Sequence, residues 1–318
     1  MSNILVLGGT GFVGRSACAR LVTRAGAAGG RLAVATRRAA AARCVQLLPT
    51  VEVIEADVHD TRQLNRLVQG RDAVINLVAI LHGSAAEFQR VHVDLPRKLA
   101  QACVDNGVRR VVHISALGAA DTAPSLYLRS KAAGEAALKA ARLDLTLLRP
   151  SVIYGESDRF LNLLARLQWL LPVLPLAGAD ARFQPVWVED VAQAVQQCLD
   201  DSKTIGMTLE CVGPSVHTLA ELARLAGRWS GHPRPIVSLP ASVARVQAWA
   251  MEWLPGAPLM SRDNLDSMRV PSVAGGQWPG LERLGIRATA MEAVVPLYLG
   301  ASQGLARLDP LRARARRG

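Results

Sequence analysis

The sequence predicts an α/β protein with a doubly wound parallel sheet and a smaller C-terminal lobe. Apolar runs typical of buried strands alternate with helical patterns over the first 150 residues, and such alternation favours a parallel sheet with helices on both faces. The first strand also runs directly into a glycine-rich turn that opens a helix. Beyond residue 150 prolines become frequent and the predicted elements shorten, which is typical of a smaller lobe.

The glycine turn is the most informative local feature. The apolar run 4–7 is followed by Gly8, Gly11 and Gly14, and the pattern over 12–22 is helical. Gly8 permits a tight turn, Gly11 lets the backbone approach a ligand, and Gly14 lets the helix lie close to the strand. Free N–H groups at a helix start bind anions, so the turn predicts a Rossmann-like site for a dinucleotide pyrophosphate. The residues expected to line it are Gly8, Thr10, Gly11, Phe12, Val13 and Gly14.

The remaining elements continue the alternation in order. Further strands are predicted over 31–35, 51–54, 73–77, 110–114 and 144–148. Helices are predicted over 61–68, 87–105 and 127–141, and in the lobe over 189–199, 218–229 and 241–253, beside a short strand over 208–212. Ligands of such sheets bind beyond the carboxyl ends of the strands, so the residues just after each strand carry most of the functional information.

Length and charge set the organisation and the partners. We expect a dinucleotide-binding core over 1–150, a lobe over 151–305 that returns some elements to the sheet, and a basic tail over 306–318. The net charge is +11, but only four of the 37 basic residues are lysines, which indicates compositional bias and not nucleic-acid binding. The tail is either a frayed end or a contact with a membrane complex or anionic lipid.

No targeting segment is predicted, because the chain begins inside its first strand. We therefore expect a cytoplasmic protein, with a peripheral position at the inner membrane as an alternative. The five cysteines lack metal-ligand or Cys-x-x-Cys spacing, so no metal site or disulfide framework is predicted.

The end of the second strand bears on the choice of cofactor. Sites that prefer NAD usually place an acid here for the ribose 2′-hydroxyl, whereas this chain has Arg37 and Arg38. Two guanidinium groups suit a 2′-phosphate, so NADP(H) is preferred over NAD(H). The alternative is that both arginines merely solvate a loop.

Two further segments are expected to touch the cofactor. Asp57 could accept a hydrogen bond from the adenine amino group while Val58 packs on the ring, or Asp57 could instead cap the helix that begins near Thr61. After the fourth strand, Leu77, Val78 and Ala79 allow the cofactor to lie close to the backbone.

Tyr127 and Lys131 form the second strong feature. Residues four apart on a helix share a face, so the ammonium group can lie near both the phenol and the cofactor ribose. A nearby cation favours phenolate and lowers the tyrosine pKa. Tyr127 could then exchange a proton with a carbonyl group while hydride moves at the nicotinamide.

These residues resemble a known family. The glycine turn, the Tyr127/Lys131 pair and the stretch 149–155 resemble extended and atypical short-chain dehydrogenases/reductases, the NAD-dependent epimerase/dehydratase group. More narrowly, four stretches look like the nucleotide-binding accessory subunits of respiratory complex I and their bacterial relatives: 113–118, 127–135, 158–162 and 183–192. For the mitochondrial members, the resemblance implies a tightly held NADPH with a structural role.

The resemblance also assigns roles residue by residue. It implies that Pro150, Ser151 and Val152 lie by the nicotinamide. The hydroxyl that active relatives use to polarise the substrate carbonyl falls on Leu117, and Ser115 is the candidate substitute; loss of such a donor costs about 3–4 kcal/mol of transition-state stabilisation.

Two functions therefore stay open. One is an oxidoreductase or epimerase acting on an unknown, quinone-like or apolar carbonyl compound, with Tyr127, Lys131 and Ser115 as catalytic residues. The other is a non-catalytic subunit or assembly factor that holds NADP(H) within a respiratory or quinone-biosynthesis complex.

Overall fold

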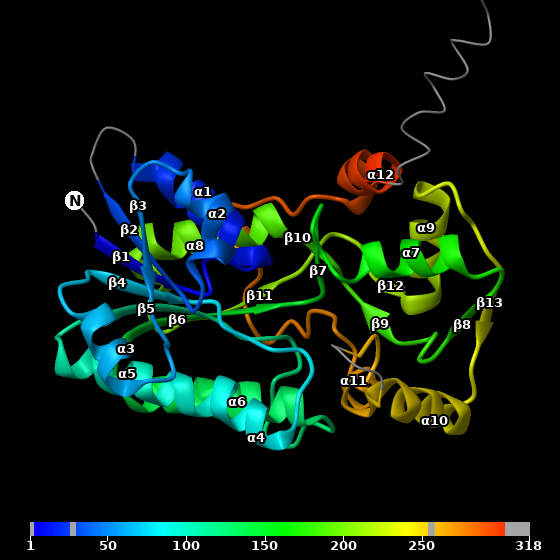
Figure 1. The fold of residues 1–318 in the computed structure, drawn as a ribbon, viewed down its shortest axis with the longest axis horizontal. Coiled ribbons are helices and arrows are strands. Elements are labelled where there is room, and N and C mark those ends of the chain that lie inside the picture. The colour runs from blue at the N-terminus through cyan, green and yellow to red at the C-terminus, as the bar shows by residue number, and fades with distance from the viewer. Residues whose placement is uncertain (1–2, 26–29, 254–257, 303–318) are drawn as a thin grey trace, which may run out of the picture. The chain divides into compact units, whose positions relative to one another are not determined.

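A computed structural model describes residues 3–25, 30–253 and 258–302 of the chain (Figure 1). The chain forms two compact units. The first unit comprises Met1–Pro150, Val188–Cys211 and Ala274–Arg287. The second comprises Ser151–Trp187, Val212–Val273 and Ala288–Gly318. The first unit thus draws two segments from the C-terminal half of the chain.

A seven-stranded sheet forms the centre of the first unit, in the order β11-β6-β5-β4-β1-β2-β3. Every neighbouring pair in it is parallel, so the predicted α/β class and doubly wound parallel sheet are confirmed. The strands are β1 Asn3–Leu7, β2 Arg31–Thr36, β3 Val51–Glu55, β4 Ala73–Asn76, β5 Arg110–Ile114, β6 Asp144–Pro150 and β11 Thr208–Cys211.

Helices cover both faces of this sheet. Figure 1 shows α1 and α8 on one face and α3, α5 and α6 on the other. Arg20 of α1 pairs with Glu189 of α8 at 3.4 Å, and Arg24 pairs with Asp200. The helices and helical turns of this unit are α1 Phe12–Ala25, η2 Ala39–Ala42, α2 Arg43–Gln46, α3 Thr61–Val68, α4 Ala85–Phe88, η3 Gln89–Asp94, α5 Leu95–Asp105, α6 Leu126–Ala140, α8 Val188–Asp200, η4 Ser202–Thr204 and η5 Leu281–Leu284.

The helix predicted over 87–105 is divided in the structure. Its middle, η3, is a π-helical turn in which the Leu95 N–H donates to the carbonyl of Arg90. Pro96, two residues after η3, has no N–H to donate to the carbonyl of His92 four residues earlier. Gly134 of α6 approaches that carbonyl closely, because a Cβ there would lie 2.0 Å from the oxygen. Both features lie at the wider turn.

The second unit packs α7, α9 and α12 around a shared apolar core. Pairs of short strands, β7 with β10, β8 with β13 and β9 with β12, complete it. Its elements are β7 Ile153–Tyr154, α7 Leu161–Leu170, β8 Leu174–Leu176, β9 Arg182–Phe183, β10 Val186–Trp187, β12 His217–Thr218, α9 Leu219–Trp229, β13 Ile236–Ser238, α10 Ala241–Glu252, α11 Arg262–Ser267 and α12 Met291–Ser302.

Asp158 organises the start of α7. Its carboxylate accepts hydrogen bonds from the N–H groups of Gly155, Phe160 and Leu161 at 3.1, 2.8 and 2.7 Å. The hydroxyl of Tyr298 on α12 donates to the same carboxylate at 3.0 Å. This buried residue therefore has a structural role in joining a loop, α7 and α12.

Across the described segments, no helix combines the length and apolar character needed to span a bilayer. The same segments hold no group of three or more His, Cys, Asp or Glu side chains that could bind a metal ion. All five cysteines are free, and only Cys44 is exposed. Burial raises the pKa of the Cys18, Cys103 and Cys198 thiols to about 12, so these thiols are unreactive.

Candidate functional site

The turn between β1 and α1 requires glycine for steric reasons. Gly8 has a φ of +81°. A Cβ at Gly14 would lie 2.2 Å from the carbonyl oxygen of Gly8, and one at Gly9 would lie 2.8 Å from Val34 Cγ1. The Gly11 N–H closes the turn on the Gly8 oxygen at 3.0 Å, so the first N–H groups of α1 can receive an anion. Partly buried side chains at this turn are Thr10, Phe12 and Val13.

Three buried polar atoms gather at the carboxyl ends of β4 and β5. Asn76 ends β4 and is paired in register with His113 of β5, and Ser115 follows that strand. Among the described residues, Asn76 Nδ2, His113 Nδ1 and Ser115 Oγ have no hydrogen-bond partner, although the three side chains are at most 3% exposed. Buried polar atoms are nearly always paired in native proteins, so this set is suited to hydrogen bonds with a ligand.

Lys131 and Tyr127 lie one turn apart on α6, which Ser125 caps. The buried Lys131 ammonium donates to the carbonyl of Ile114, at the end of β5, at 2.7 Å. Burial lowers the pKa of Lys131 to about 8, against the opposing effect of Glu135. Burial raises the pKa of Tyr127 to about 12.

The expected lowering of the tyrosine pKa by Lys131 is therefore wrong. The ammonium group is hydrogen-bonded to a backbone carbonyl, and burial determines the pKa of the phenol. Tyr127 is consequently protonated at neutral pH and is suited to donate a proton.

His92 packs against Tyr127 and is held by a defined chain of hydrogen bonds. The rings lie edge to face with centroids 5.5 Å apart. His92 Nε2 accepts from the Ile80 N–H at 3.1 Å, which leaves the proton on Nδ1, 2.8 Å from Ser130 Oγ. The Ser130 hydroxyl donates in turn to the carbonyl of Tyr127 at 2.7 Å. Burial, with a contribution from Lys131, lowers the pKa of His92 to about 3, so the ring is neutral.

Arg37 and Arg38 are exposed directly after β2. Burial lowers the pKa of the nearby His59, and Arg90, Lys98 and Arg37 lower it further while Asp57 opposes them. Several cations therefore act on one small region beyond β2 and β3. A carboxylate also reaches this loop from β3, since Glu55 Oε2 accepts the Ala39 N–H at 3.2 Å.

The alternative that Asp57 caps the following helix is wrong. Asp60 is the N-cap of α3, and its carboxylate accepts the Gln63 N–H at 2.8 Å. Asp57 lies too early in the chain for this, and its carboxylate accepts the His59 N–H at 3.0 Å to form a tight turn. Val58 beside it is buried.

The segment after β4 packs against the glycine turn. The Leu77 N–H donates to the carbonyl of Leu7 at 2.9 Å, and a Cβ at Gly8 would lie 3.0 Å from the carbonyl carbon of Leu77. The Val78 N–H donates to Asn76 Oδ1 at 3.2 Å. Ala79 is exposed at the end of this stretch.

The stretch 150–152 crosses the boundary between the units. Pro150 ends β6 in the first unit, and its carbonyl accepts the Leu117 N–H at 3.0 Å. Ser151 and Val152 belong to the second unit. The Ser151 hydroxyl donates to the carbonyl of Ser272 at 2.7 Å and accepts the Gln184 N–H at 3.3 Å, so it is already engaged within its own unit.

A groove of about 530 Å³ also runs along α6, lined by Ala119, Ala120, Asp121, Arg129, Ala132, Ala133, Glu135, Ala136, Lys139 and Arg149. Glu135 and Arg149 form a two-pronged ion pair at 2.9 and 2.6 Å within it. Neither Tyr127 nor Lys131 lines this groove, so it is separate from the candidate site.

Comparison with known proteins places this chain in a family. Residues 4–207 match the NAD dependent epimerase/dehydratase family. The chain belongs to that family. The predicted resemblance to the epimerase/dehydratase group is therefore confirmed.

Two curated relatives of this chain are of different kinds. The chain is 30% identical over 296 residues to NADH dehydrogenase [ubiquinone] 1 alpha subcomplex subunit 9 of Mus musculus, covering 90% of this chain and 77% of the relative. It is 31% identical over 255 residues to a ceramide reductase of Caulobacter vibrioides, covering 78% of each. The predicted similarity to complex I accessory subunits and bacterial relatives is confirmed.

Solved structures share the fold of this epimerase/dehydratase family member. A UDP-glucuronic acid 4-epimerase from Bacillus cereus superimposes with a TM-score of 0.69 at 16% identity, covering 93% of this chain and 98% of that one. A dTDP-glucose 4,6-dehydratase from Streptomyces venezuelae gives a TM-score of 0.70 at 22% identity, covering 93% and 95%.

Three residues of the site, His92, Ser130 and Asn76, are not among those that the sequence predicts. His92 has no partner residue in the sequence at the spacing of metal ligands. Its place in the π turn brings its ring against Tyr127. Ser130 lies within the Tyr127–Lys131 motif, and its position between those two residues is the signal that marks it. Asn76 is the last residue of β4, and a polar residue near the carboxyl end of a predicted strand is the signal that could have found it.

Acid should destabilise the fold through His92. Its pKa is about 3 in the folded chain against 6.5 as the ordinary value, so below about pH 6.5 the unfolded chain binds a proton that the folded chain does not. The free energy of unfolding then falls as the pH drops, by about 2 kcal/mol at about pH 5. Urea titrations at several pH values should show this loss reduced in His92→Gln and unchanged in the control His232→Gln. Equal acid sensitivity of the wild type and His92→Gln would contradict the assignment.

Proposed function

We propose that this chain binds NADP(H) at the carboxyl edge of its sheet and uses it as an oxidoreductase or epimerase on an apolar, quinone-like carbonyl compound. The observation that carries the proposal is the set of unpaired buried atoms on Asn76, His113 and Ser115. Lys131 reaches the same strand end through the Ile114 carbonyl. Polar groups of this kind suit a nicotinamide ribose and a carbonyl oxygen.

Two features support NADP(H) as the cofactor: the glycine turn suits a pyrophosphate, and cationic side chains lie beyond β2 and β3. The turn leaves no room for side chains on Gly8 and Gly14, and the helix start behind it offers N–H groups to a pyrophosphate. Exposed Arg37 and Arg38, with Arg90 and Lys98 acting on the same region through His59, favour a 2′-phosphate over a bare 2′-hydroxyl. Backbone at Leu77, Val78 and Ala79 and the side chains of Asp57 and Val58 would complete the adenosine side.

The catalytic part assigns one role to each side chain. The nicotinamide supplies or accepts the hydride when it is bound. Tyr127 donates a proton to the carbonyl oxygen, since burial keeps its pKa at about 12, and Ser115 Oγ donates a hydrogen bond to that oxygen. Lys131, with a pKa of about 8, is mainly protonated at neutral pH and binds the ribose hydroxyls.

Cofactor choice can be tested by titration at fixed salt. We expect NADPH to bind at least about tenfold more tightly than NADH, because charge-assisted pairs to phosphate are worth about 1.5–3 kcal/mol. The double variant Arg37→Ala/Arg38→Ala should lose this preference and keep NADH affinity. The matched control Arg62→Ala/Arg66→Ala removes the same charge from exposed positions on α3 and should keep it. Tighter binding of NADH by the wild type would refute the preference.

A second function is favoured by one specific residue. Leu117 is buried at the position where active relatives carry the hydroxyl donor, and a curated relative is a complex I subunit. A chain that keeps NADP(H) as a permanent structural element, in a respiratory or quinone-biosynthesis complex, would need Lys131 but no carbonyl donor.

A further inference from the structure

His92 connects two segments of the candidate site. It is 2% exposed, and both ring nitrogens are engaged, because Nε2 accepts the Ile80 N–H and Nδ1 lies 2.8 Å from Ser130 Oγ. Ile80 directly follows the stretch 77–79, which packs against the glycine turn. Ser130 lies on α6, three residues after Tyr127. One imidazole therefore joins the segment after β4 to the helix that carries Tyr127.

His92 holds Tyr127 at two points. The Ser130 hydroxyl donates to the Tyr127 carbonyl at 2.7 Å, so the chain of hydrogen bonds from His92 ends on the backbone of Tyr127. The imidazole also meets the phenol ring edge to face, and Phe88 completes the cluster with ring centroids 5.6 Å from His92 and 6.2 Å from Tyr127. Packing of this kind restricts the orientations that the phenol can adopt.

The hydrogen bonds of His92 cannot be reproduced by an apolar ring of similar size. The Ile80 N–H can only donate, so Nε2 must be an acceptor, and the neutral ring then carries its proton on Nδ1 and donates to Ser130. Phenylalanine would fill the same space but could neither accept from Ile80 nor donate to Ser130. The histidine at this position therefore has a function beyond filling space.

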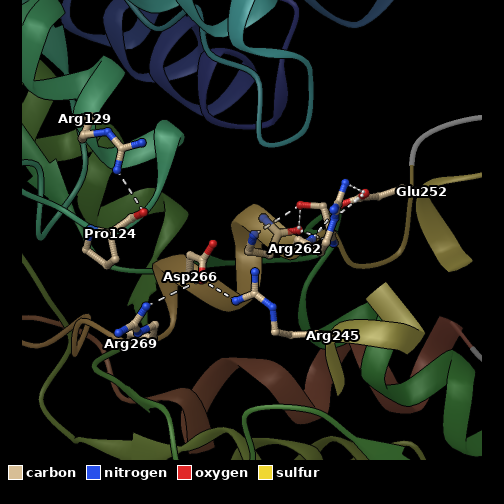
Figure 2. A network of polar contacts seen from close by, with 9 residues as sticks. Pro124, Arg129, Arg245, Glu252, Arg262, Asp266 and Arg269 are labelled. Carbon is tan, nitrogen blue, oxygen red and sulfur yellow. Dashed lines mark hydrogen bonds and ion pairs between the residues drawn. The ribbon is translucent and has the colours of Figure 1, made fainter. Parts of the chain in front are cut away.

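Other residues anchor the start of α6. Ser125 caps the helix, and Arg129 donates to the carbonyls of Ala123 and Pro124 at 2.6 and 2.9 Å. Figure 2 shows the Arg129 side chain directed at the Pro124 carbonyl. These bonds hold the backbone of the first turn, so loss of the His92 contacts should leave α6 in place and release the phenol.

We propose that His92 is a positioning residue for Tyr127. Through its ring and through Ser130 it fixes the phenol relative to the stretch 77–80, next to the proposed cofactor site. The proposal rests on the proposed role of Tyr127 as proton donor, because the position of the phenol affects turnover only if the phenol takes part in it. Such geometry matters strongly, since a displacement of about 1 Å costs about 100-fold in rate.

Turnover of two variants tests the proposal. His92→Phe keeps a ring and removes both hydrogen bonds, and Ser130→Ala removes the link to the Tyr127 carbonyl. Each should lower the turnover number for NADPH oxidation by about 10- to 100-fold and leave NADPH affinity unchanged. In the Tyr127→Phe background neither should have a further effect, because a positioning residue acts only through the group that it positions. The control Thr23→Ala removes a hydroxyl that donates to the Ala19 carbonyl at 3.0 Å in α1, and it should turn over normally.

A spectroscopic measurement on the same variants needs no turnover. The chain has three tyrosines, so labelling with fluorotyrosine gives three fluorine NMR signals, which Tyr127→Phe and Tyr154→Phe assign. The Tyr127 signal should shift or broaden in His92→Phe and in Ser130→Ala, whereas the Tyr154 signal should keep its position. Each variant is measured well below its own thermal transition, and Ser130→Ala carries the test if His92→Phe does not fold.

The two measurements separate failure of this proposal from failure of the proposed function. If the wild type turns over, the proposal is overturned when both variants match it, or when they lose further turnover in the Tyr127→Phe background. If the wild type oxidises no NADPH, the proposed catalysis fails and the fluorine spectrum decides. An unchanged Tyr127 signal in the variants then overturns the positioning role of His92, and a changed signal upholds it.

Discussion

Gly14→Ala should abolish nucleotide binding and lower the free energy of unfolding by about 3 kcal/mol, the upper range for overpacking a core. The added Cβ would lie 2.2 Å from the carbonyl oxygen of Gly8 and 2.6 Å from the Cα of Gly9. Both contacts are with backbone, which cannot rotate away as a side chain could. The turn must therefore open, and the N–H groups at the start of α1 would lose their alignment.

Gly300→Ala is the matched control for this variant. Gly300 also lies within a helix, α12, but a Cβ there would be 3.5 Å from the nearest atom, an ordinary contact. Denaturant unfolding and NADPH titration of both variants separate steric overlap from a general effect of replacing a helical glycine. If Gly14→Ala binds NADPH with wild-type affinity, the pyrophosphate does not lie at this turn.

Tyr127→Phe should lower the turnover number by about 10²–10⁴-fold, the usual contribution of a positioned acid or base. NADPH affinity should change little, because Lys131 keeps its bond to Ile114 without the phenol. The measurement is NADPH oxidation with quinones and long-chain ketones as acceptors. A drop in the turnover number at constant NADPH affinity identifies Tyr127 as the proton donor.

Tyr154→Phe provides the comparison for Tyr127→Phe. The Tyr154 hydroxyl donates to the carbonyl of Thr289 at 2.9 Å within the second unit, so its loss should cost about 1 kcal/mol of stability and no activity. Wild-type turnover by Tyr127→Phe would exclude the catalytic role. The structural function is favoured if the wild type oxidises no NADPH and a respiratory or quinone-biosynthesis complex fails to assemble without this chain.

The strands of the sheet could be predicted because branched apolar residues dominate them, as in the run Ile-Leu-Val-Leu over 4–7. The prediction for 110–114 coincides with β5, and that for 144–148 is extended by two residues in β6. The helix over 61–68 coincides with α3. These elements are determined locally, by periodicity and by capping residues such as Asp60.

The interruption by η3 could not be predicted from local pattern. Pro96, which has no N–H, is visible in the sequence, but the close approach of Gly134 from another helix to the His92 carbonyl is not. His92 reaches Tyr127 through this turn. The pKa of Tyr127 could not be predicted from the sequence either. The spacing places Lys131 on the same helix face as Tyr127, but only the packed structure shows that desolvation of the phenol outweighs the effect of the cation.

The loops proposed to hold the cofactor were predictable in position but not in their hydrogen bonds. The positions of Arg37, Asp57 and Leu77 followed from the rule that ligands bind beyond the carboxyl ends of parallel strands. Their hydrogen bonds did not, because the partners come from other segments, as with the Ala39 N–H and Glu55 of β3.

The central claim is that the chain binds NADP(H) at the turn between β1 and α1 and uses it. The most direct measurement is mass spectrometry of nucleotide released from the purified protein on denaturation, followed by exchange against labelled NADPH. We predict NADP(H) in the released material, and bound nucleotide that exchanges with the added NADPH. NAD(H) in its place, or a chain that carries no nucleotide and binds none, would contradict the claim; a nucleotide that never exchanges would contradict its use in turnover.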